Sequence, residues 1–489
     1  MTLPVLIVGA GPVGLTLASE LHRYGVPFRI VDKAAQRTDK SKALVLWSRT
    51  LELLDRGMGA SRFIAAGFRA TGVAFAEGDK VVAHVPFDKV ASPYSYGLMI
   101  PQSDTERLLE EYLEGQGVKV ERATEATAFD FRTDGVTSEL RGAAGQIEKV
   151  DAQWVVGCDG AHSVVRHALN VPFQGATNPS DWMLADVHMT GYPRPDSDMS
   201  IYWHRDGVLV ILPITPGRYR IIADVPASGA KHPATLTLEQ MQAIVDRRGP
   251  TGTRLFDPVW LSGFRINARK VHDYRHGRVF LAGDAAHVHS PAGGQGMNTG
   301  MQDVFNLAWK LALVIHGTCR EGLLDSYSPE RSVVGDKVLK SASRLTSIGT
   351  LRNPILQSLR NLLGGAVLNT HRVGQAIAKT MTEVDINYPN SPLNGATAKS
   401  GPHPGERMAP VPGDIPFGAG SKPMFTLCGV PSADLTALAE RFPDLVDSTV
   451  RAPIDNNTIS LIRPDGYLVV SAANIADVAA TLEKIQLRS

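Results

Sequence analysis

The chain has 489 residues and very little cysteine. Its three cysteines, Cys158, Cys319 and Cys428, are far apart in the sequence and form no C-x-x-C pair. Disulfide frameworks are rich in cysteine and zinc sites typically use closely spaced cysteine pairs, so the sequence predicts neither, and no metal site is expected.

An excess of charge of one sign is also missing. Lysine and arginine total 50, aspartate and glutamate total 49, and the net charge is +1. This balance gives no reason to expect a nucleic acid or an anionic membrane as partner. The longest apolar helical run, at about 305–315, contains Lys310 and is too short to cross a bilayer. We expect a globular protein without signal peptide or membrane span, in the cytoplasm by default.

The beginning of the chain carries a glycine pattern typical of dinucleotide binding. An apolar strand at 5–8 leads into the G-x-G-x-x-G segment 9–14, a helical segment follows, and a second strand at 28–31 ends at Asp32. Asp32 lies about 20 positions after the glycines, where an acid that binds a ribose diol is expected. Because a carboxylate repels a 2′-phosphate, the pattern favours FAD or NAD over NADP.

The most informative segment runs from 278 to 311. An apolar strand ends in Gly283-Asp284, a loop with Pro291 and several glycines follows, and an apolar helix is expected from about Met301. The acid can bind ribityl hydroxyls, the glycines let the backbone approach closely, and the helix start offers N–H groups to an anion. The segment suits a polar cofactor that bears phosphates.

A third segment, 155–166, runs from a strand into Asp159-Gly160 and then into a helix with Arg166. Alone it is only a turn. Together, and in this order, the three segments resemble the single-component FAD-dependent aromatic hydroxylases, which include para-hydroxybenzoate hydroxylase and phenol hydroxylase. Segments 48–54, 100–106 and 324–331 match the family's flanking motifs, and the resemblance covers about the first 390 residues.

The resemblance implies FAD as cofactor, NADPH or NADH as a transient co-substrate without its own domain, and O2. It implies insertion of one oxygen atom into a phenolic or polycyclic aromatic substrate through a flavin C4a-hydroperoxide. The N–H groups from Gly294 to Asn298 are expected to stabilise the reduced flavin, with Pro291 beside the reactive carbon. Many members have an arginine where this chain has Lys42, which keeps the charge but loses the bidentate fork. The expected cofactor contacts are Gly9, Gly11, Pro12, Val13, Gly14, Asp32, Lys33, Lys42, Arg49, Gln102, Asp159, Gly283, Asp284, Pro291, Gly294, Gly296, Met297 and Asn298.

The predicted fold class is α/β with three domains. An FAD-binding Rossmann-like domain of the glutathione-reductase type takes residues 1–71, 99–175 and 266–390, with trailing helices. A mainly antiparallel substrate-binding sheet takes 72–98 and 176–265, where short strands flank Gly and Pro turns. The tail, 398–489, resembles a thioredoxin-like domain; because it lacks C-x-x-C, a structural role is expected. The leucine-rich run 354–376 is either a dimer surface or a core or lid helix, so the protein is a monomer or a homodimer.

The residues that would activate the substrate are less clear from the sequence. Tyr202, His204, Arg220 and Trp47 are candidates for binding the substrate hydroxyl, although an ordinary sheet or surface residue is the commoner role for each. His287 and His289 are expected to have structural hydrogen bonds, and His162 and Arg166 to contact the nicotinamide.

An FAD oxidoreductase of the same fold without aromatic hydroxylation, a dehydrogenase or a halogenase, is the alternative. The W-x-W-x-I-P motif of related halogenases is absent. A binding protein without catalysis is the weakest hypothesis, because three separate cofactor segments would serve no chemistry.

Overall fold

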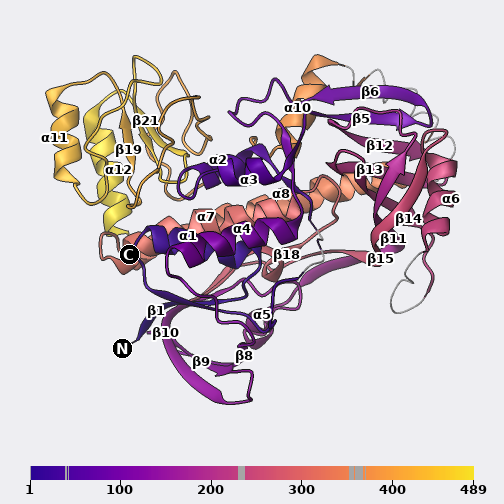
Figure 1. The fold of residues 1–489 in the computed structure, drawn as a ribbon. Helices are drawn as coiled ribbons and strands as arrows, with labels where there is room; N and C mark the ends of the chain where they lie inside the picture. Colours follow the sequence, from indigo (N-terminus) through magenta and orange to yellow (C-terminus); the bar gives the residue numbers. More distant parts are fainter. Residues whose placement is uncertain are drawn as a thin grey trace.

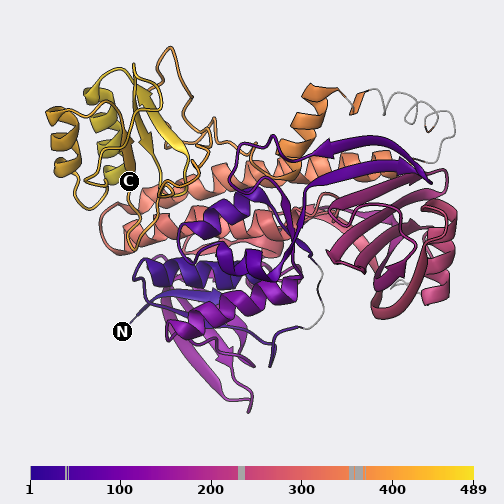
Figure 2. The same ribbon diagram turned by 45° about the horizontal axis from the view of Figure 1, so that its top comes forward.

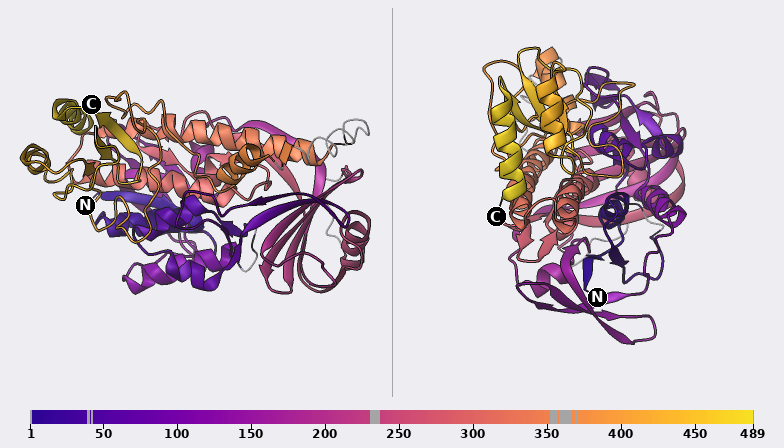
Figure 3. Two further views of the ribbon diagram at one scale, coloured as in Figure 1. Left: turned by 90° about the horizontal axis from the view of Figure 1, so that it is seen from above. Right: turned by 90° about the vertical axis from the view of Figure 1, so that its left-hand side faces the viewer.

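A computed structural model describes residues 2–38, 41, 43–229, 237–351, 357, 367–368 and 370–488. The first of two large sheets lies below a layer of long helices, and the second lies at the right-hand end of that layer (Figure 1). A small C-terminal region packs on the same helices at the end away from the second sheet, as the view from above also shows (Figure 2; Figure 3, left).

The first sheet is the predicted nucleotide-binding sheet. Its parallel core has the order β17-β10-β1-β2, formed by Val279–Leu281, Ile147–Gly157, Leu3–Val8 and Phe28–Val31. Antiparallel strands extend it: β9 (Val136–Arg141) pairs with β10, β8 (Glu125–Phe131) with β9, and β16 (Arg275–His276) with β17. The centre of β1 is fully buried, as expected for a parallel strand covered on both faces.

Helix α1 (Pro12–Arg23) packs against β1 and β2 of this sheet, and α4 (Gln102–Gly115) and α7 (Gly296–Ile315) pack against α1. Beside them lies α8 (Tyr327–Gly349), which runs toward the second sheet (Figure 1). Shorter elements fill the corners: α2 (Ser48–Asp55), α3 (Ser61–Ala66), α5 (Val164–Ala168), the turns η1 (Gly283–Ala285) and η2 (Glu321–Ser326), and a small sheet of β3 (Val45–Leu46), β7 (Gly97–Met99) and β4 (Phe68–Ala70).

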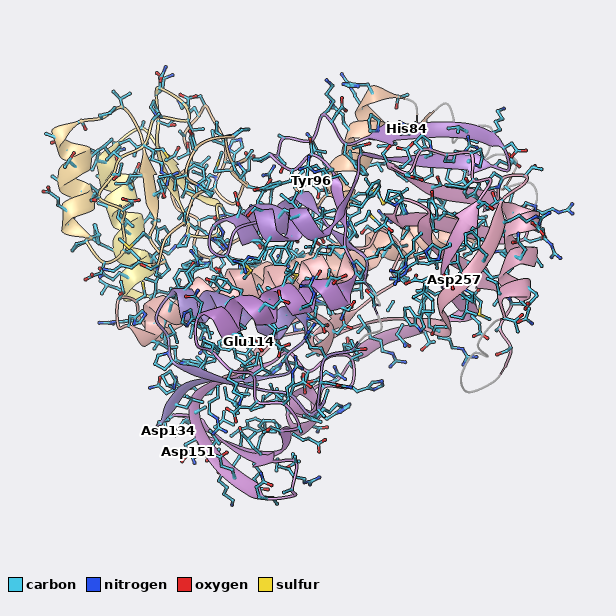
Figure 4. All side chains as sticks on the ribbon, viewed as in Figure 1. His84, Tyr96, Glu114, Asp134, Asp151 and Asp257 are labelled. Carbon is cyan, nitrogen blue, oxygen red and sulfur yellow. The ribbon has the colours of Figure 1, made fainter. Side chains whose placement is uncertain are left out.

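The second sheet has eight strands in the order β18-β15-β11-β14-β13-β12-β5-β6. Most pairs are antiparallel, as the sequence predicts, and β12 with β5 is the parallel exception in this order. His84 on β6 and Asp257 on β15 mark its two sides (Figure 4). The strands are β5 (Gly72–Glu77), β6 (Lys80–Pro86), β11 (Gln174–Thr190), β12 (Asp198–His204), β13 (Gly207–Thr215), β14 (Arg218–Val225), β15 (Arg254–Lys270) and β18 (His287–Val288).

Different helices pack on the two faces of this sheet. Helix α6 (Leu238–Arg248) packs with Tyr202, Leu209 and Ile221, while α10 (His371–Met381) packs with Val73, Phe75 and other residues of the opposite face. Most of the leucine-rich run 354–376 lies outside the described residues, so its predicted role stays a prediction. No helix in the described part of the chain is both long and apolar enough to cross a membrane.

The C-terminal region contains the antiparallel strands β19 (Thr426–Cys428), β20 (Ile459–Ile462) and β21 (Leu468–Ala472), with α11 (Ala433–Arg441) and α12 (Ile475–Leu487). The likeness of this region to thioredoxin stays a prediction.

A buried ionic cluster joins this region to the long helices. Glu330 accepts hydrogen bonds from Lys310 at 2.8 Å and from Arg463 at 2.7 Å, and Arg463 also pairs with Asp465. Because all four side chains are almost fully buried, loss of one partner would leave an uncompensated charge.

Candidate active site

A cavity of about 1540 Å³ runs between the two large sheets. One end, called here the dinucleotide end, is lined by the loops that follow β1, β2 and β10, including Gly9, Gly11, Asp32 and Asp159. The other end, called here the chamber, is lined by one face of the second sheet together with α8 and α10. Small-ligand sites usually occupy about 300–1,000 Å³, so the cavity has room for more than one molecule.

The glycines at the dinucleotide end have different physical roles. Gly9 has a φ of +104°, and a Cβ there would lie 2.5 Å from the carbonyl oxygen of Cys158. A Cβ on Gly14 would lie 1.9 Å from the carbonyl oxygen of Gly9, so this glycine permits the turn to pack against its helix. A Cβ on Gly11 would meet nothing within 4 Å. The backbone at the start of α1 therefore faces open space in the cavity.

Asp32 is held in place beside this turn. One carboxylate oxygen accepts a hydrogen bond from the Ala10 backbone N–H at 2.6 Å, and the other from Ala34 at 2.8 Å. The acid at the end of β2 is thus oriented by the loop after β1, and its side chain still lines the cavity.

In the middle of the cavity lies the glycine loop, residues 291–298. The indole N–H of Trp47 donates to the Gly293 carbonyl at 3.0 Å. Asn298 donates to the carbonyls of Val45 at 2.9 Å and Gly294 at 3.0 Å, and it accepts from the Trp47 backbone N–H at 2.8 Å. These bonds fix the loop against the segment that contains β3.

The turn before this loop is supported by a buried carboxylate on α7. Asp303 accepts hydrogen bonds from the Gly283 backbone N–H at 3.0 Å, from His287 at 2.8 Å and from Arg331 at 2.7 Å. Burial alone would raise the pKa of Asp303, but the charge of Arg331 and the interactions with His287 and the Gly283 N–H together outweigh it, and the pKa is lowered. Asp303 therefore stays ionised and holds the turn that carries Asp284.

The chamber is mainly apolar because alternate residues of neighbouring strands share one face. Ile201 lies opposite Phe75 and Val210, and Trp203 lies opposite Val208. All of these line the cavity, as does Ile222, which lies opposite Val210.

Arg220 also lines the chamber, but Asp186 neutralises its charge through contacts of 2.7 and 2.9 Å. Arg220 further donates to the Ser41 carbonyl at 2.6 Å, which ties the sheet to the first domain.

These features fit FAD. An open backbone turn at the start of α1, an oriented acid at the end of β2 and a glycine loop at the start of α7 line one continuous cavity. Backbone N–H groups at helix starts suit phosphates and other anions.

The sequence profile of the FAD binding domain family matches residues 2–342. The chain belongs to the family of FAD-dependent aromatic hydroxylases. It is 36% identical to the 6-methylpretetramide 4-monooxygenase of Streptomyces rimosus, over 84% of this chain and 75% of that protein. It is 33% identical to the 12-dehydrotetracycline 5-monooxygenase/anhydrotetracycline 6-monooxygenase of Streptomyces rimosus subsp. rimosus, over 97% and 96% of the two chains. The solved structure of CabE, an aromatic hydroxylase from angucycline biosynthesis, superposes with a TM-score of 0.80 at 30% identity and covers 100% of both chains.

Most residues expected to contact FAD line the cavity of this hydroxylase. They are Gly9, Gly11, Pro12, Val13, Asp32, Lys33, Gln102, Asp159, Asp284, Pro291, Gly294, Gly296 and Met297. Three others lie behind the wall: Gly14 and Gly283 pack against neighbouring elements, and Asn298 fastens the glycine loop. Lys42 lies outside the described residues.

Two polar lining residues of the hydroxylase have further structural bonds. Gln102 accepts from the Ala43 N–H at 3.2 Å and donates to Glu106 at 2.8 Å, which fixes its position in the wall. Asp159 accepts from the Val165 N–H at 3.2 Å, and burial raises the pKa of its carboxyl.

Arg49 was expected to contact the cofactor, but it does not line the cavity. It pairs with Glu52 at 3.0 Å and donates to the Asp465 carbonyl at 2.6 Å. Helix α2 therefore directs this arginine toward the C-terminal region.

Tyr202 and His204 do not line the chamber either, which corrects their candidacy for binding substrate. Strand alternation sends both away from the face of Ile201 and Trp203, and the Tyr202 hydroxyl donates to Tyr192 at 3.2 Å. Arg166 likewise lies outside the wall, since it donates to the carbonyls of Ala285 and Ala161, whereas His162 lines the cavity.

His287 has the expected structural hydrogen bond, which it makes to Asp303. His289 lines the cavity, and burial lowers its pKa to about 4, so the imidazole is neutral near pH 7. No cluster of three potential metal-binding side chains occurs among the described residues.

Proposed function

We propose that this hydroxylase uses NADPH or NADH and O2 to insert one oxygen atom into a polycyclic phenolic ring. The observation that carries the proposal is the apolar chamber, which continues directly from the glycine loop of the FAD site. A flat aromatic molecule bound there would lie beside the loop. The relatives named for 6-methylpretetramide and anhydrotetracycline support a polycyclic substrate.

Bound FAD would supply the reductive activation of O2, and the protein would bind, orient and exclude water. Asp284 would bind the ribityl chain, and the dinucleotide end would bind the pyrophosphate and ribose, with Asp32 on the ribose diol. The backbone N–H groups of Gly294 to Asn298 would stabilise negative charge on the reduced ring. Pro291 would form the wall next to the reacting carbon.

The chain's own residues also set the conditions for productive hydroxylation. Trp47 and Asn298 hold the glycine loop in one shape, so the donors are positioned before the reaction begins. The apolar walls of the chamber keep water away from the reacting atoms, which favours oxygen transfer over side reactions. His162 is the described residue that we assign to nicotinamide contact, because Arg166 is engaged in structural hydrogen bonds.

A substrate panel tests this proposal. The FAD-loaded protein is mixed with NADH or NADPH and with phenols of one to four fused rings, and cofactor oxidation, O2 consumption and product mass are followed together. We expect the multi-ring phenols to accelerate oxidation and to gain one oxygen atom. Acceleration that yields only hydrogen peroxide across the panel would instead indicate an FAD oxidoreductase without hydroxylation.

A further inference from the structure

Charge is unevenly distributed along the cavity. The carboxylates that line it, among the described residues, all belong to the dinucleotide end and its turns: Asp32, Glu125, Asp159 and Asp284. The cationic side chains that line the chamber are Arg220, Arg344 and Arg372. A ligand in the chamber therefore meets apolar walls and guanidinium groups, but no carboxylate on the described wall.

The three arginines differ in their partners. Arg220 is buried and paired with Asp186 at 2.7 Å. Arg344, on α8, and Arg372, on α10, are exposed at the wall, and neither has a hydrogen bond or ion pair with any described residue. Two positive charges at the chamber thus lack a counter-charge within the described part of the protein.

We propose that Arg344 and Arg372 bind an anionic oxygen of the aromatic substrate, either a carboxylate or an ionised hydroxyl. A guanidinium group matches the planar carboxylate and forms charge-assisted hydrogen bonds with it. The apolar wall nearby lowers the local polarity, so the interaction is stronger than between two fully solvated ions. This assignment rests on the proposed function only in taking the ligand to be aromatic.

The two arginines come from different helices, and each of these helices is tied to the FAD site. Helix α8 is tied to the FAD site, because Thr346 and Ser290 share a hydrogen bond at 2.8 Å. Helix α10 is tied to the glycine loop through Gln295, which donates to the Thr380 carbonyl at 2.7 Å. An anion bound by both arginines would therefore orient the rings relative to the glycine loop.

Binding of two matched probes to the FAD-loaded protein tests the proposal. Anthraquinone-2-carboxylate and its neutral carboxamide have nearly the same shape, and their affinities are measured by the perturbation of flavin absorbance. An arginine contact at a partly exposed site contributes up to about 1 kcal/mol, or about fivefold in affinity. We expect the wild-type protein to bind the carboxylate more tightly than the carboxamide, by up to about fivefold for each arginine that contacts it.

The chain offers matched controls for the variants. Arg344→Gln and Arg372→Gln should each weaken carboxylate binding by about fivefold and leave carboxamide binding unchanged. Lys340→Gln on α8 and Lys379→Gln on α10 remove the same charge from exposed residues that do not line the cavity, and they should keep the preference. Equal affinity for the two probes, absent binding of both, or the same loss in the lysine controls would overturn the proposal.

A third probe separates the two anionic groups. Alizarin has an ionisable hydroxyl and no carboxylate, and its colour reports ionisation. If the arginines recognise an ionised hydroxyl, the pKa of bound alizarin should be lower in the wild-type protein than in the arginine variants. If that pKa is the same in all three proteins while the carboxylate preference is intact, the site binds carboxylates.

These measurements need no turnover. A protein that shows the preference but inserts no oxygen would contradict the proposed function alone. A protein that inserts oxygen but binds the carboxylate and the carboxamide equally would contradict this inference alone.

Discussion

Asp303 accepts a hydrogen bond from the backbone N–H of Gly283 at 3.0 Å, so a carboxylate buried in α7 holds the turn that presents Asp284 to the cavity. The same carboxylate accepts from Arg331 on α8, whose neighbour Glu330 bonds Arg463 of the C-terminal region. Buried hydrogen bonds made by two consecutive residues of α8 therefore link the C-terminal region to the FAD site.

Asp303→Asn should weaken both FAD retention and stability. The change leaves Arg331 buried without its counter-charge, a loss that typically costs about 3–5 kcal/mol. Thermal unfolding and the fraction of FAD retained after gel filtration measure the two effects. As a control, Asp325→Asn removes an exposed carboxylate that pairs with Arg275, and it should change neither thermal stability nor FAD retention. Full FAD retention in Asp303→Asn would argue against a positioning role for Asp303.

Asp284→Ala should weaken FAD binding and leave the fold intact. Asp284 is exposed at the cavity wall, so its loss empties no core space. A hydrogen bond to a charged group contributes about 1.5–3 kcal/mol, which predicts at least about tenfold weaker binding. Equilibrium titration of the apoprotein with FAD measures it, and an unchanged affinity would reject the ribityl role.

The sequence predicted those parts of the fold and site that depend on local patterns. The glycine turn, Asp32 at the end of β2 and the Gly283-Asp284 turn all contribute to one cavity wall or its support, because each is a strand-to-helix connection with its own signature.

The rest depends on tertiary packing that local patterns do not contain. Tyr202 and Trp203 are adjacent in one strand, and only the position of the glycine loop decides which of them faces the chamber. Arg49 lies in a motif associated with the cofactor, yet its partner Asp465 is 416 positions away. The sequence alone also did not show that Asp303 supports the Gly283 turn, although a carboxylate within an apolar helix indicates a buried polar contact.

Trp47→Phe should make oxygen insertion less efficient without abolishing FAD binding. Phenylalanine keeps most of the ring volume but removes the N–H that donates to Gly293, a bond contributing about 1 kcal/mol. A looser glycine loop should divert a larger share of reducing equivalents to hydrogen peroxide, measured as peroxide per NAD(P)H oxidised. Trp309→Phe, whose ring packs on Phe425 away from the loop, should keep the wild-type ratio.

The stability of the folded protein should depend on pH through the buried carboxyl of Glu383. It is buried between Thr299 and Gln302 at distances of 2.8 and 2.6 Å, and burial raises its pKa from 4.5 to about 8. Between pH 4.5 and 8 the folded state binds a proton that the unfolded state releases, so this residue lowers stability as the pH rises through that window.

Glu383→Gln imitates the protonated side chain and should remove this contribution. We expect the variant to gain on the order of a few kcal/mol over wild type at pH 8 and to match it below pH 4.5. Thermal unfolding across this pH range measures the difference; a constant offset at every pH would contradict the role given to Glu383.

The central claim, that this FAD protein transfers oxygen to an aromatic ring bound in the chamber, is tested most directly with isotopically heavy O2. The FAD-loaded enzyme is supplied with NAD(P)H and a multi-ring phenol that stimulates its oxidation, and the product is examined by mass spectrometry. We predict a product that contains one heavy oxygen atom from O2. A product whose new oxygen comes from water, or an unchanged ring with only heavy hydrogen peroxide formed, would contradict the account.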